Sequence, residues 1–292
     1  MTAHRRSHRP GTIAAALAAL VLSATCAPQR LVLPTGSGSP LADYTRIFEQ
    51  ASARCARVRT LTAELGISGR AGGTKLRGRV IAGFERPGAL RLEAVAPFGA
   101  PVFVLAGKAG AATLVLERDN RVLDGADPAA ILEALTGVWL APDDLGAVLA
   151  GCVAADNVPQ DGRAFGDRWA RVQMPRDVTV YLHRTDAGWR IEAGAIGRVA
   201  VEYLSILDGV PREIRIDAGG NGAGRGQADL RISLSQVEIN TAIDPAAFTV
   251  VVPRDAVPMT LDELREAGPL GRAGKQARAM SHEPRAGRFL LP

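Results

Sequence analysis

The three cysteines of the chain are the residues whose chemistry depends most on their setting. Cys26 follows an apolar run over 13–22 and three small residues, a setting in which an exported protein can receive a lipid on its thiol. The match to a lipidation signal is imperfect, because Leu22 lies four residues before the cysteine instead of three. If Cys26 carries lipid, Cys55 and Cys152 remain, and they form either a disulfide or two buried free thiols.

Side chains suited to catalysis are scarce after residue 25. His183 stands alone in an alternating strand pattern, which predicts a solvent-facing side chain, and His282 lies near the C-terminus. Asp143 and Asp144 open a predicted helix, where the helix dipole favours carboxylates as structural groups. The glycine-rich run 219–226 lies between two predicted strands, so it is not a phosphate-binding loop, and no metal-ligand spacing appears. We therefore predict that the protein is not an enzyme and that it holds no metal and no cofactor.

The charge of the chain is concentrated at its ends. The whole sequence has a net charge of +5, but without residues 1–25 and 272–292 it carries 27 Lys and Arg against 29 Asp and Glu. The body of the chain therefore lacks the basic excess that nucleic-acid binding requires. Composition predicts four segments: a signal peptide over 1–25, a flexible tether over 26–40, one domain over 41–267 and a disordered basic tail over 268–292.

The predicted elements of the domain are mostly strands of period two, separated by short breaks. Short connections indicate an antiparallel arrangement, so we predict a mainly β fold with some helix, an α+β protein of about eleven strands. Asp127 is the expected N-cap of the second helix, and Thr260 with Glu263 forms a capping box for the last. Helices are expected over 41–58, 128–138, 142–152 and 260–268; strands are expected over 61–72, 74–85, 89–96, 101–107, 112–118, 168–174, 177–184, 189–196, 199–207, 212–218, 228–239 and 248–253.

Alternation within the predicted strands creates one apolar face that must be covered. Leu90 and Leu92 lie opposite Arg91, and Leu230 and Ile232 lie on one face of a later strand. The predicted helices are few and short for so broad a face. Two interpretations stay open: the apolar side chains pack on one another and on the helices, or they line a cavity for an apolar ligand. The pattern alone favours the packed core.

Two stretches resemble a known family. They are "LRLEAVAPFGAPVFVLAG", a strand, a Pro-Phe-Gly loop and a strand, and "ILEALTGVWLAPDDLGAVLAG", which contains the predicted helix pair. Their order and the weaker matches that follow are similar to the outer-membrane lipoprotein receptor family, LolB, over roughly 60–240. The segment 240–253 instead resembles the closing strand of the periplasmic carrier LolA.

This resemblance implies an unclosed antiparallel β-barrel covered by helices, with an apolar cavity for the acyl chains of lipoproteins. It implies a monomer, anchored through Cys26 to the outer membrane and facing the periplasm, that receives lipoproteins or other lipids, with a periplasmic carrier as a further partner. Phe98, in the loop between two strands, takes the position of an exposed residue that meets the membrane. The implied cavity-lining residues are Leu90, Leu92, Phe103, Leu105, Leu114, Leu116, Val180, Leu182, Leu230, Ile232 and Leu234.

Three other functions compete with this one. A soluble lipid carrier would have the same fold without the anchor at Cys26. A structural lipoprotein of an envelope assembly would have a packed barrel and no ligand. An exported hydrolase is the third, and the scarcity of histidines argues against it.

Overall fold

The computed structural model describes residues 31–95, 101–219 and 227–267. The chain divides into two compact units, 1–32 and 33–292, and the fold described below is that of the second unit. Cys26, Phe98 and the predicted signal peptide and basic tail lie outside the described residues. No described helix has the length and apolar character that crossing a membrane requires.

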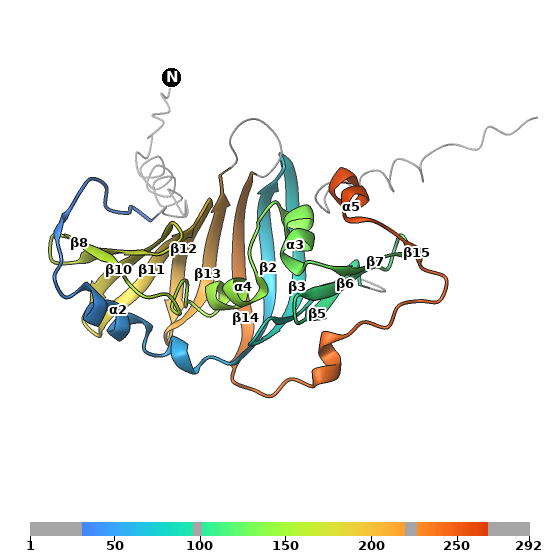
Figure 1. Cartoon of the computed structure of the whole chain (residues 1–292), viewed down its shortest axis with the longest axis horizontal. Helices are drawn as coiled ribbons and strands as arrows, with labels where there is room; N and C mark the ends of the chain where they lie inside the picture. The colour runs from blue at the N-terminus through green and yellow to red at the C-terminus, as the bar shows by residue number, and fades with distance from the viewer. Residues whose placement is uncertain (1–30, 96–100, 220–226, 268–292) are drawn as a thin grey trace, which may run out of the picture. The chain divides into compact units, whose positions relative to one another are not determined.

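A single sheet of fifteen strands dominates the described residues (Figure 1). Its order is β1-β8-β9-β10-β11-β12-β13-β14-β2-β3-β4-β5-β6-β7-β15, so the two edges do not join. All neighbours are antiparallel except β7 and β15. The strands are β1 Ser39–Pro40, β2 Thr60–Ala71, β3 Thr74–Glu85, β4 Ala89–Val95, β5 Phe103–Lys108, β6 Ala111–Leu116, β7 Arg121–Ala126, β8 Asp161–Phe165, β9 Trp169–Met174, β10 Val178–Thr185, β11 Gly188–Ile196, β12 Val199–Leu207, β13 Val210–Ala218, β14 Ala228–Ile239 and β15 Val257–Pro258.

Six short helical segments accompany this sheet. They are α2 Tyr44–Ser52, α3 Pro128–Thr136, α4 Pro142–Leu149, α5 Leu261–Ala267 and the two 3-10 turns η1 Cys55–Arg57 and η2 Pro245–Phe248. In Figure 1, α3 and α4 lie over one face of the sheet. The α+β class and the unclosed antiparallel sheet covered by helices are thus confirmed, with more strands than the eleven expected.

The two faces of the sheet differ in chemistry. The face beneath α4, here named the inner face, carries the apolar side chains of the strands in one buried cluster. The opposite, outer face carries ion pairs between neighbouring strands. On β13, Arg215 Nε lies 2.8 Å from Asp229 Oδ1 of β14, and Asp229 lies directly across from Asp217 in the register. Pairs of this kind on an exposed face favour solubility and strand register more than stability.

One predicted strand is wrong. Residues 248–253 were expected to form a strand because valines follow one another there, but Asp244 caps a 3-10 turn that begins at Pro245 and ends at Phe248. Phe248 is 3% exposed, and η2 packs on the outer side of β4 and β5. The valines continue along the surface, where Val251 is 93% exposed. An N-cap and a proline at the first helical position thus outweigh β-branched composition.

Four strands were missed, the two-residue β1 and β15 and the longer β7 and β8, and the tether is shorter than predicted. β7 and β8 are short and each contains an Asp-Gly pair, so their sequences show no period-two signal. Pairing with β6 and β9 holds them in the sheet. Ser39 and Pro40, which the composition assigned to the tether, pair with β8.

Candidate functional site

The eleven residues implied to line a cavity all lie on the inner face. Each is 9% exposed or less, and all belong to the same buried cluster. Direct cross-strand pairs join several of them, as Leu92 faces Leu105 and Leu105 faces Leu114. None of the eleven lines either pocket described below. The structure therefore brings these residues together, and in this conformation they are packed.

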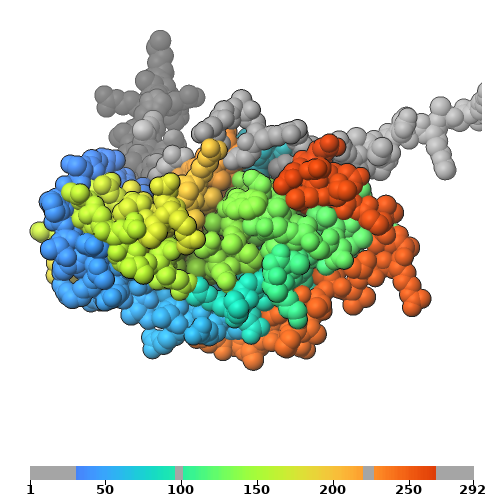
Figure 2. Space-filling model, viewed as in Figure 1, coloured from blue at the N-terminus to red at the C-terminus, as the bar shows by residue number. Residues whose placement is uncertain are grey.

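A cover made of α3, α4 and the following residues 150–156 lies on the inner face. Its atoms, in green, fill the middle of the face seen in the space-filling view (Figure 2). α3 begins as predicted, because Asp127 Oδ1 accepts hydrogen bonds from the backbone N–H groups of Ala129 and Ala130 at 2.7 and 3.4 Å. α3 ends at Gly137, which has the left-handed φ of 76° typical of a helix C-cap.

α4 approaches the sheet through a residue without a side chain. A Cβ added to Gly146 would lie 3.3 Å from the ring of Phe84 on β3. At its first turn, Asp143 Oδ1 accepts a hydrogen bond of 2.8 Å from the backbone N–H of Gly88, between β3 and β4. Asp143 is therefore a structural carboxylate, as its position at a helix start predicts.

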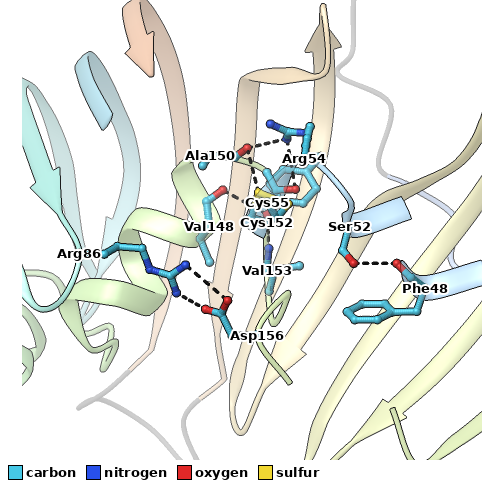
Figure 3. The surroundings of a disulfide bond; sticks show 12 residues. Phe48, Ser52, Arg54, Cys55, Arg86, Val148, Ala150, Cys152, Val153 and Asp156 are labelled. Atoms are coloured by element: carbon cyan, nitrogen blue, oxygen red, sulfur yellow. Dashed lines mark hydrogen bonds and ion pairs between the residues drawn. A yellow bond between two sulfur atoms is a disulfide. The ribbon is translucent and has the colours of Figure 1, made fainter. Parts of the chain in front are cut away.

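A disulfide joins the cover to the segment that precedes β2 (Figure 3). Cys55 in η1 and Cys152 after α4 are bonded, and their Cα atoms are 5.5 Å apart. Both residues are buried, at 2% and 3% exposed. Of the two arrangements that the sequence left open, the structure contains the disulfide. Because 97 residues separate the two cysteines, the bond closes a long loop that includes β2 to β7.

Tyr203 fixes the same turn of the cover from the sheet side. Its side chain is 1% exposed, its hydroxyl donates to Val148 O at 3.1 Å, and it accepts from the backbone N–H of Val153 at 3.3 Å. Burial raises the pKa of Tyr203, so the hydroxyl remains a donor throughout the physiological range. One tyrosine thus satisfies two backbone groups of the cover.

Two arginines also hold the cover (Figure 3). Arg54 donates to Ala150 O at 2.6 Å and to Gly151 O at 3.4 Å, where carbonyls at the end of α4 lack helical partners. Burial lowers the pKa of Arg54, and the neighbouring Tyr203 opposes that shift. Arg86 forms an ion pair with Asp156, and this hydrogen-bonded carboxylate raises the pKa of the guanidinium. Arg86 is the more buried partner, while Asp156 is mostly exposed.

Two pockets flank the end of the cover. The smaller has a volume of about 20 Å³, room for about one water, between the disulfide, Phe84 and Gly146. The larger, of about 340 Å³, opens on the other side of Ala147, Ala155 and Asp156, which line both pockets. The larger pocket is lined by Asp144, Ala147, Ala154, Ala155, Asp156, Asn157, Arg176, Val178 and Ile196.

Asp144 is the perturbed acid of the larger pocket. Burial raises its pKa first, and the nearby Asp143 adds to that effect, while Arg176 across the pocket lowers it. Asp144 itself is exposed at the rim of the pocket, so its carboxylate is accessible to a ligand beside the cation of Arg176.

Outside this region, His183 is half-buried on the outer face. Its ring lies 4.6 Å from the ring of Trp169 on the neighbouring strand, so it packs against an aromatic side chain. In the described part of the chain, no group of three His, Cys, Asp or Glu residues is placed to hold a metal ion. Absence of enzymatic activity remains a prediction.

Most of the residues that hold the cover carry no signal in the sequence that would identify them. Arg54, Arg86 and Asp156 lie in turns or at the ends of elements, where charged residues are common. Tyr203 offered one signal: it continues the inward alternation of Val199 and Val201, a position at which a tyrosine needs a partner for its hydroxyl.

Comparisons with known proteins do not assign this chain to a family. No protein-family model and no curated protein matches the sequence. Among solved structures, a LolA superfamily protein from Nitrosomonas europaea aligns with 70% of this chain and 97% of its own, at 11% identity and a TM-score of 0.48. A DUF1329 family protein from Desulfovibrio piger aligns with 71% and 98%, at 10% identity and a TM-score of 0.44. The lipoprotein LppX of Mycobacterium tuberculosis aligns with 68% and 95%, at 10% identity and a TM-score of 0.28. At these values the likenesses establish neither family nor function.

Proposed function

We propose that this protein binds the acyl chains of lipids or lipoproteins on the inner face of its sheet, beneath the cover, as a lipid-anchored protein of the cell envelope. The observation that carries the proposal is the architecture of the apolar face. A broad sheet is covered by two short helices and a loop, held at one end by a disulfide, one tyrosine and two arginines. A second sheet would bury the same face permanently, whereas displacing a short cover requires breaking only the few contacts described above.

The energetics of such a site require only a small difference between the bound and free states. Each CH₂ that leaves water contributes about 0.8 kcal/mol, and the membrane offers an acyl chain a similar gain. When the cover is displaced, its own apolar residues become exposed. An incoming acyl chain then takes their place as the partner of Leu92, Leu105 and Leu114. Exchange of one apolar partner for another is close to balanced, which suits a protein that must also release its cargo.

Binding of fluorescent fatty acids of increasing length tests this proposal directly. We expect saturable binding to the purified chain, with affinity that rises about fourfold for each added CH₂ until the site is full. Competition by unlabelled fatty acids of the same length controls for the fluorophore. Absence of binding, or affinity that does not depend on chain length, would refute acyl-chain binding and favour the structural lipoprotein, whose packed core this conformation resembles.

Anchoring at Cys26 is the part of the proposal that separates a membrane-bound receptor from a free carrier. Cells that express the full chain are labelled with radioactive palmitate, and Cys26→Ala is the matched control. Label in the wild type and its loss in Cys26→Ala support the anchored receptor. An unlabelled wild-type protein that still binds fatty acids would leave a soluble carrier as the function.

Insertion of lipoproteins into the outer membrane is the finer part of the proposal. It rests on the motif resemblance described above and on the apolar inner face, to which the eleven residues belong. Transfer of a lipoprotein from a periplasmic carrier to liposomes in the presence of the lipidated protein is the corresponding assay. A protein that binds acyl chains but leaves the transfer rate unchanged would fit lipid binding without an insertion role.

A further inference from the structure

The pocket of about 340 Å³ beside α4, here named the head pocket, has a floor and a rim of different chemistry. Its floor contains Val178, Ile196 and Ala154. Val178 and Ala154 belong to the buried cluster of the inner face, and Ile196 packs against it. Its volume lies near the lower end of the range of about 300–1,000 Å³ for small-molecule sites. The head pocket is therefore a place where the surface of the molecule meets the apolar interior.

The rim of the head pocket carries charges of both signs. Asp144 comes from the first turn of α4, and Arg176 comes from the turn between β9 and β10. Among the described residues, Asp144 takes part in no hydrogen bond or ion pair, and Arg176 makes one long hydrogen bond of 3.5 Å to Asn157. Asp156, the other carboxylate of the rim, is already paired with Arg86. Asp144 and Arg176 thus line the same pocket, and most of their hydrogen-bonding groups are available to a ligand.

The turn that presents Arg176 has an unusual backbone. Arg176 and the following Asp177 have φ values of 59° and 54°, in the left-handed region that ordinary residues avoid. Turns of this geometry usually contain Asn-Gly or Asp-Gly, because glycine adopts positive φ without a steric cost. At the β12–β13 turn, Asp208 is followed by Gly209 and conforms to that rule. The β9–β10 turn instead keeps a side chain at both positions and so places a guanidinium at the rim.

We propose that the head pocket binds the zwitterionic head of a phospholipid, a phosphodiester that carries a primary ammonium. Arg176 contacts the phosphodiester, Asp144 contacts the ammonium, and the acyl chains continue over Val178 and Ile196 toward the inner face. An anionic head without an amine satisfies Arg176 alone and leaves Asp144 facing a negative ligand. The proposal rests on the proposed acyl-chain binding and adds a choice between lipid heads.

Calorimetric titration with short-chain dihexanoyl lipids tests this inference. Dihexanoyl-phosphatidylethanolamine and dihexanoyl-phosphatidylglycerol share their chains and phosphodiester and differ in the amine. We expect the wild type to bind the ethanolamine lipid up to about fivefold more tightly, the upper end of the gain from one solvent-exposed charge pair. Asp144→Asn should remove this preference, and Arg176→Gln should weaken both lipids by about fivefold.

Matched controls come from exposed turns away from the head pocket. Asp186→Asn and Arg118→Gln remove the same charges from residues that enter no hydrogen bond or ion pair with the described part of the chain. Both should leave the two affinities unchanged. Equal affinities in the wild type, or equal effects of the control and rim variants, would overturn the head pocket while fatty-acid binding persists. Absence of binding by lipids and fatty acids alike would overturn the proposed function with it.

Discussion

Replacing Tyr203 by phenylalanine removes one oxygen atom from the attachment of the cover and leaves the packing volume nearly unchanged. In the wild type this hydroxyl donates to Val148 O and accepts from the N–H of Val153. After Tyr203→Phe, Val148 O keeps the hydrogen bond of 3.0 Å from the N–H of Gly151. The N–H of Val153 has no other described partner, and Val153 is fully buried.

The magnitude follows from that asymmetry. Leaving a buried donor without a partner destabilises the protein by about 1–3 kcal/mol. Losing a hydrogen bond is close to neutral when both of its groups have other partners. We therefore expect Tyr203→Phe to lower the free energy of unfolding by about 1–3 kcal/mol. Because the lost bond lies between the cover and the sheet, the amide of Val153 should exchange with solvent faster than in the wild type.

Urea denaturation with the disulfide intact measures the first quantity, and hydrogen exchange measures the second. Tyr181→Phe is the matched control, because Tyr181 is half-exposed on the outer side of β10 and its hydroxyl makes no described hydrogen bond. That variant should stay within about 0.5 kcal/mol of the wild type. If Tyr203→Phe also stays within that range and leaves exchange at Val153 unchanged, the hydroxyl does not hold the cover.

Three further predictions concern the cover and the last helix. A Cβ at Gly194 would lie 2.8 Å from Val153 Cγ1, so Gly194→Ala should destabilise the protein by about 1–3 kcal/mol, whereas Gly78→Ala, with open space around it, should not; thermal unfolding with intact disulfides compares them. Reduction of the disulfide should lower the unfolding free energy by up to about 5 kcal/mol, as expected for a loop of this length, and should speed proteolysis within 150–156; an unchanged urea midpoint would contradict this. The hydrogen bond from the N–H of Thr260 lowers the pKa of Glu263, as does Arg121 to a smaller extent. The contribution of this cap to the free energy of unfolding should therefore be present above the unfolded pKa of about 4.3 and be lost as the pH falls through the pKa of the folded protein. An NMR titration that finds an ordinary glutamate pKa for Glu263 would contradict this.

Much of the sheet was predictable because its strands carry their period in their own sequence. β3 and β14 have the predicted bounds, 74–85 and 228–239, since apolar and polar residues alternate along both. The helix caps at Asp127 and Thr260 were equally predictable from the sequence, because each is a local hydrogen bond between a side chain and nearby backbone. Local information was sufficient wherever the interaction itself is local.

The attachment of the cover could not be predicted, because it joins residues distant in the sequence. Arg54 meets carbonyls 96 and 97 positions further along, and Arg86 meets Asp156 at a separation of 70. Nothing in the composition around these residues distinguishes them from ordinary surface charges. The head pocket could not be predicted for the same reason, because its rim combines residues of α4 with residues of the β9–β10 turn.

The sheet order has a consequence for how the chain reaches its folded state. The centre of the sheet is the pairing of β2 with β14, in which Leu65 faces Leu234. The strands from β2 to β7 follow one another as chain neighbours, and so do those from β8 to β14, so each half needs only local turns. Cys55 and Cys152 flank the first half in the sequence, so the disulfide needs no residue of the second half and attaches the cover to the first half alone. Tyr203 belongs to the second half, so its two hydrogen bonds to the cover require that the two halves meet at the central pairing of β2 with β14.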